Sequence, residues 1–96
     1  MPKQVLKHQS VDATLTERGK VHGPFAEHAR IAQAIKAAMR LSVHWDALPD
    51  DVKESLEMIA HKQARVLNGG DTCADSYHDI AGYAVLVERR LNGVKS

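Results

Sequence analysis

The sequence predicts an all-α protein, an antiparallel bundle of three long helices with a short helix before them. In three separate stretches, apolar residues recur at steps of three and four, the spacing that gives a helix one apolar side. Gly and Pro residues separate these stretches, as expected at helix ends. Only 4% of the residues are aromatic, so the helices must pack through aliphatic side chains and alanine. Small residues let helices approach closely, which favours a bundle.

The chain has 96 residues, enough for one domain and too few for two. Residues 1–11 carry no clear periodicity, and we expect them to form a flexible N-terminal arm. A single helical domain is expected at residues 12–92, followed by a C-terminal tail at residues 93–96. No internal repeat divides the domain further.

The first two helices are separated by Gly23. A short helix is expected from Asp12 to Lys20. The first long helix should begin near Pro24, because proline is tolerated in a first turn, and should run to Leu41 or Ser42. Its apolar stripe is Phe25, Ala29, Ala32, Ile35 and Met39.

The second long helix is expected to begin at Asp50 or Asp51, whose charge suits the positive helix end. Asn68-Gly69-Gly70 is a stop signal. Gln63 interrupts the apolar stripe near its middle, and it is either a satisfied polar group in the core or a contact at a site. The stripe is Val52, Leu56, Ile59, Ala60, Val66 and Leu67.

The last helix is expected from Cys73 to Leu91, with Asp71 or Thr72 as its cap. From Ile80 to Val87 it is apolar nearly all round. Such a helix is either central to its own bundle or shared with a second chain. Because so short a chain cannot surround a helix completely, we expect a homo-oligomer, a dimer or a tetramer. The main stripe is Tyr77, Ile80, Ala84, Val87 and Leu91.

Charge and composition exclude several classes of protein. Lys and Arg total 13 against 12 for Asp and Glu, a balance that argues against a nucleic-acid-coating protein. One cysteine, Cys73, excludes an internal disulfide framework and a multi-Cys zinc site. The six histidines show no paired ligand spacing, and His28 is expected to be a packed core or interface residue. No apolar run could cross a membrane and the N-terminus lacks a signal peptide, so the expected location is the cytoplasm.

The middle helix carries an acidic row opposite its apolar stripe. Glu54, Glu57 and His61 fall in one sector, at steps of three and four, and Arg65 follows on the same flank. Two interpretations stay open. The row is either a metal-binding set of carboxylates or a solvated face with an ordinary Glu57–His61 surface pair.

The last helix carries Asp75 and Asp79, two like charges four residues apart. Asp75 lies in the first turn, where it suits the helix dipole. Asp79 is too far along the helix for that role and has apolar neighbours, so it needs a cationic partner. An Arg65–Asp79 ion pair and a shared Mg²⁺ both satisfy this need. Facing acidic rows on antiparallel helices suit Mg²⁺, which prefers oxygen ligands and retains several waters.

These two segments also carry a resemblance. Glu54–Arg65 and Asp75–Ala84, with Glu17–Phe25 as a lead-in, resemble the small phage and prophage proteins related to the MazG-like all-α NTP pyrophosphatases. The resemblance covers roughly residues 12–91. Similar enzymes use ExxE on one helix and ExxD on the next to bind Mg²⁺. Here Ser76 stands where the second motif has its first acid, with the acid at Asp75 instead.

The resemblance implies a Mg²⁺-dependent nucleotide-binding protein, which if catalytic would be a nucleoside triphosphate pyrophosphohydrolase of house-cleaning or phage nucleotide metabolism. It implies Glu57 and Asp79 as principal catalytic and metal-binding residues, assisted at the metal by Glu54 and Asp75. The substrate-binding residues it implies are Lys62, Arg65, Arg18 and His22. The alternative is a non-catalytic phage accessory protein in the host cytoplasm that binds a host protein or sequesters a nucleotide signal.

Overall fold

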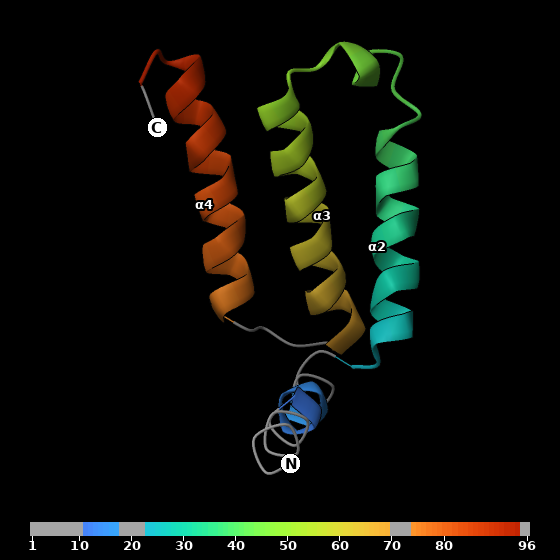
Figure 1. Ribbon diagram of the computed structural model, residues 1–96. Coiled ribbons are helices and arrows are strands. Elements are labelled where there is room, and N and C mark those ends of the chain that lie inside the picture. Colours follow the sequence, from blue (N-terminus) through green and yellow to red (C-terminus); the bar gives the residue numbers. More distant parts are fainter. Residues whose placement is uncertain (1–10, 18–22, 70–73, 95–96) are drawn as a thin grey trace, which may run out of the picture.

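The computed structural model describes residues 11–17, 23–69 and 74–94, and every regular element within them is helical. The three long helices run antiparallel, each to the next (Figure 1). This arrangement confirms the all-α prediction for the described residues. A short helix at residues 11–17 is followed by α2 (Phe25–Met39), the 3-10 helix η1 (Trp45–Ala47), α3 (Asp50–Gly69) and α4 (Ala74–Leu91).

The helix ends lie close to the expected positions. Pro24 has an extended backbone, with φ −63° and ψ 138°, and α2 begins directly after it. At the other end α2 stops at Met39, shortly before the expected end. The cap candidates Asp71 and Thr72, like Cys73, lie outside the described residues, as does the end of the short helix expected at residues 12–20.

The long helices form one open layer. α3 packs against α2 on one side and α4 on the other, while α2 and α4 make little contact with each other. Figure 1 shows the three lying side by side, with α3 in the middle. The single chain therefore provides one layer of helices, where a folded domain ordinarily needs two.

The buried residues are small or polar. Among the described apolar side chains, only Ala32, Ala60 and Ala64 are buried. The larger residues of the predicted stripes on α3 and α4 are half-buried or exposed; Leu67, for example, is 64% exposed and Tyr77 54%. Small side chains line the flanks of α3, and its apolar third side faces no other helix. Buried polar and charged residues lie beside the alanines: His28, Ser55, Lys62 and Ser76.

In the described part of the chain, no helix combines the length and the apolar character that a membrane span requires.

Candidate functional site

Asp79, the mid-helix acid of α4, forms an ion pair with Lys62 of α3. The Lys62 Nζ lies 3.0 Å from the Asp79 Oδ2. The Lys62 side chain is only 11% exposed, against 43% for Asp79. Removing an ammonium group from water costs several kcal/mol unless a counter-charge is near. Asp79 therefore neutralises a buried lysine. Of the two partners left open for Asp79, Arg65 or a shared Mg²⁺, the structure shows neither, because Lys62 takes that place.

Two further polar contacts follow the same seam between α3 and α4. The Ser55 hydroxyl donates a hydrogen bond of 2.9 Å to the carbonyl oxygen of Tyr83. Nearer the start of α3, Asp51 pairs with Arg90, and the hydrogen bond from Arg90 lowers the pKa of the Asp51 carboxyl. Polar interactions at three points along its length thus stabilise the α3–α4 contact.

The other flank of α3 carries the second principal acid, Glu57. Its carboxylate accepts a hydrogen bond of 3.1 Å from Arg40, just beyond α2. His61 lies next to His28, with 3.3 Å between His61 Nδ1 and His28 Nε2. The two rings meet edge to face, with their centroids 4.6 Å apart. His28 is 5% exposed, which confirms that it is a packed residue.

The electrostatic environment of His61 is positive. Burial lowers the pKa of His61 from 6.5 to about 4, and the nearby His28 acts in the same direction. His61 is thus a neutral ring at physiological pH, set among positive charges. The cations that contribute are Arg65, Lys62 and Lys36.

The four candidate metal ligands are spread over the layer. Glu57 pairs on the α2 flank of α3, whereas Asp79 pairs on the α4 flank. Glu54 and Asp75 are both exposed, and each lies near the start of its helix. Because α3 and α4 are antiparallel, those starts lie at opposite ends of the layer (Figure 1). Across the described ranges, no three His, Cys, Asp or Glu residues gather into a group that could hold a metal, so this arrangement does not fit a metal cage.

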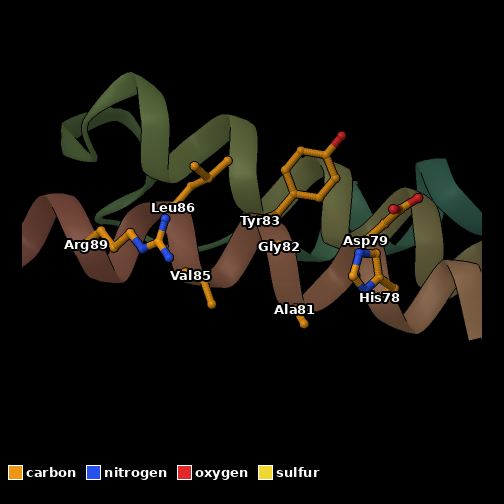
Figure 2. Close-up of a pocket in the computed structure, with 8 residues that line it drawn as sticks. All are labelled: His78, Asp79, Ala81, Gly82, Tyr83, Val85, Leu86 and Arg89. Carbon is orange, nitrogen blue, oxygen red and sulfur yellow. The ribbon is translucent and has the colours of Figure 1, made fainter. Parts of the chain in front are cut away.

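A shallow recess of about 600 Å³ lies along α4 and is lined by that helix alone. Figure 2 shows Tyr83 and Leu86 directed towards α3, with Ala81 and Val85 on the other side of the helix. The hollow follows from Gly82, where a Cβ would meet no atom within 4 Å. It is a surface trough rather than an enclosed ligand pocket. Its lining residues are His78, Asp79, Ala81, Gly82, Tyr83, Val85, Leu86 and Arg89.

Comparison with known families gives one match, which covers most of the chain. Residues 4–91 match the model of DUF6378, a domain of unknown function. The chain belongs to the DUF6378 family. That description names no activity, so the function of this DUF6378 chain has to be inferred from its residues. No curated protein and no solved structure matches the chain.

The implied substrate residues of this DUF6378 chain have different environments. Arg18 and His22 lie outside the described residues. Lys62 is buried and paired, whereas Arg65 is half-buried. Within the described residues, Arg65 makes no ion pair.

Sequence reasoning missed the residues that fasten the helices, namely Arg40, Ser55 and Arg90. The sequence does contain a signal for the α3–α4 contact, in the spacing of the polar residues along α3. Asp51, Ser55 and Lys62 lie four and then seven positions apart, which places them on one side of a helix.

Proposed function

We propose that the chain is a non-catalytic accessory protein on a MazG-like scaffold, which works as a homo-oligomer through the surfaces of its helical layer. The Lys62–Asp79 pair carries this proposal. Asp79 is the acid on which a catalytic interpretation depends, and it lies 3.0 Å from a buried lysine ammonium. The Asp79 carboxylate therefore contributes to stability. The molecule that the protein binds would be a host protein or a sequestered nucleotide signal.

Ser76 supports the same proposal. It occupies the position at which the resemblance would place the first acid of the second motif, and it is 3% exposed. A carboxylate in that place would have to be buried, which is costly without a paired cation. The serine fits where the acid would not.

An unfolding experiment tests the role of Asp79. Replacing it, Asp79→Asn, should lower the free energy of unfolding by about 1–3 kcal/mol, because Lys62 then stays buried without its counter-charge. The double variant Lys62→Met with Asp79→Asn should recover much of that loss, since no buried charge remains.

A metal-ligand role for Asp79 makes the opposite prediction. Removing one of two like charges at Asp75 and Asp79 would leave the metal-free protein as stable or more stable, and would weaken Mg²⁺ binding instead. Urea unfolding followed by circular dichroism, with and without Mg²⁺, separates the two outcomes. A stable Asp79→Asn protein that has lost Mg²⁺ binding would contradict the accessory-protein proposal.

A second candidate is Mg²⁺-dependent nucleotide binding, as the MazG-like resemblance implies. It is favoured by cations that remain available, since within the described residues Lys36 and Arg65 make no ion pair. Lys36 and Arg65 both act on His61, so positive charge is present for phosphate oxygens. No catalytic step is assigned to this arrangement.

Nucleotide binding is tested by thermal unfolding with Mg²⁺ or Mn²⁺ and a panel of NTPs, dNTPs and modified nucleotides. A ligand that binds only the folded state raises the Tm. The rise should disappear in the variant Lys36→Gln with Arg65→Gln, which removes the positive charges beside His61, and persist in the control Arg89→Gln, which removes an exposed cation of α4. No rise across the panel would count against this candidate.

A further inference from the structure

One side of the helical layer is an apolar face that all three long helices share. We define the apolar face by the residues around a recess of about 540 Å³ on it: Ile35, Gln63, Val66, Leu67, Tyr77 and Ile80. The recess is lined without any Asp, Glu, Lys or Arg. Leu56 and Leu91 extend the face, since they lie seven positions before Gln63 and fourteen after Tyr77. The apolar face therefore runs along most of the layer.

The charged residues of α3 lie elsewhere on the helix. Glu54 and Gln63 are nine positions apart, which places their side chains about 180° from each other around the axis. The ion pairs of Lys62 and Glu57 occupy the two flanks in between. One side of the layer is thus charged and the other is apolar.

The burial within one chain is small for a folded protein. In the described residues, no apolar side chain larger than alanine is buried. A second layer of helices on the apolar face would supply the missing burial.

Gln63 identifies the kind of molecule that fits this face. Its side-chain amide has both a donor and an acceptor, and it lies among apolar residues that offer neither. Across a two-fold axis, two such amides can satisfy each other, because a symmetric interface places each surface against its own copy. The absence of charge in the recess also means that like charges would not meet there. A second copy of this chain meets both conditions.

We propose that two copies pack apolar face against apolar face about a two-fold axis near Gln63, forming a dimer with two layers of helices. This inference gives a surface to the homo-oligomer of the proposed function and rests on that part of it alone. The paired Gln63 amides set the register of the two layers, as a single polar residue does in a helical interface. The charged side of each layer faces outward.

Sedimentation of the full chain tests the proposal. The wild type should sediment as a dimer, and Leu67→Glu should weaken the dimer at least 100-fold, because the two new carboxylates would be buried close together. Val85→Glu is the control. It changes an exposed apolar residue (37% exposed) on the side of α4 turned away from α3 (Figure 2) and should leave the dimer intact.

Cross-linking gives a second readout that does not depend on a disruptive charge. In a Cys73→Ser background, Gln63→Cys should form a covalent dimer with a short thiol cross-linker. Glu54→Cys, on the opposite side of α3, should not. Cross-linking through position 54 in preference to 63 would overturn the proposal.

The outcomes distinguish the dimer face from homo-oligomer formation in general and from the role of Asp79. A wild-type monomer at high protein concentration would overturn both the dimer face and the homo-oligomer. A dimer that survives Leu67→Glu, or that is lost in Val85→Glu, would overturn the apolar face as the interface while retaining the oligomer. Neither result bears on Asp79, whose role is decided by the unfolding experiment.

Discussion

The two flanks of α3 are fastened by different kinds of polar contact. Towards α4, the seam holds a buried charge, Lys62, neutralised by Asp79 at 3.0 Å. Towards α2, the corresponding position holds two imidazoles, His28 and His61, 3.3 Å apart. Protonation of His61 would add a positive charge among Arg65, Lys62 and Lys36, whereas no histidine takes part in the Lys62–Asp79 pair. The flanks should therefore fail under different conditions.

The largest effect is expected from filling the space beside α3 itself. Ala64 has no exposed surface, so Ala64→Leu forces a larger side chain between packed helices and should cost about 3 kcal/mol. Ala81→Leu, at an exposed position of α4, should change stability by less than about 0.5 kcal/mol. Urea unfolding of the two variants at equal protein concentration measures the difference. Similar losses in both would show that the contact at Ala64 is not tightly packed.

Gly23 offers the next largest test, on the α2 flank. Its φ of +77° disfavours any residue with a side chain, and a Cβ there would lie 2.8 Å from the Asn68 Nδ2. That amide donates a hydrogen bond to the Pro24 carbonyl oxygen and so joins the end of α3 to the start of α2. Gly23→Ala should therefore cost about 2 kcal/mol.

Gly82 is the matched control for that variant. A Cβ there would meet nothing within 4 Å, and the residue lies inside α4. Gly82→Ala should therefore raise the free energy of unfolding by about 0.5–1 kcal/mol. Thermal unfolding of both variants reports the two signs, and a stabilised Gly23→Ala protein would contradict the proposed strain.

The helices could be predicted from sequence because their signals are local. The break at Gly23 and the stop at Asn68 depend on neighbouring residues, and the long helices begin and end within three residues of the expected positions. The ion pairs could not be predicted in the same way. Whether Asp79 meets Lys62 or Arg65 depends on how α3 and α4 slide and rotate against each other, which no single helix specifies.

Burial was the harder property to anticipate. The resemblance implies Lys62 as a phosphate-binding residue, and a lysine is ordinarily exposed, yet in the structure Lys62 is buried against α4. The apolar stripe predicted the side of α3 that packs, but α2 and α4 occupy the flanks and leave Leu67 uncovered. Alanine on the flanks lets the helices come close, so the larger side chains remain for contact with another chain.

Acid should weaken the α2 flank before the α4 flank. The pKa of His61 is lowered from 6.5 to about 4 in the folded chain. Between these values the unfolded chain binds a proton that the folded chain does not, so stability falls as the pH drops below about 6.5 and levels off near 4. The full shift corresponds to roughly 3 kcal/mol, which solvent screening of the half-buried ring reduces to about 1–2 kcal/mol.

Urea unfolding at pH 7 and at pH 4.5 measures this loss. His61→Gln removes the titrating ring and should make the difference between the two pH values smaller. Asp79→Asn, on the other flank, leaves His61 in place and should keep the difference between the two pH values. An unchanged pH dependence in His61→Gln would show that another group is responsible.

The smallest change in stability is expected from removing the Ser55 hydroxyl on the α4 flank. The Ser55 hydroxyl donates to the Tyr83 carbonyl oxygen at 2.9 Å, but Tyr83 lies inside α4, where its carbonyl also accepts the hydrogen bond of the helix. Ser55→Ala removes the donor and leaves no buried group without a partner, so it should cost about 1 kcal/mol or less. Ser55→Val adds volume at a site that is 7% exposed and should cost more, because the helices approach closely there. Ser55→Ala could instead lower the free energy of unfolding as much as Asp79→Asn. The α4 flank would then depend on its hydrogen bonds as much as on its buried charge, and only the histidines would distinguish the two flanks.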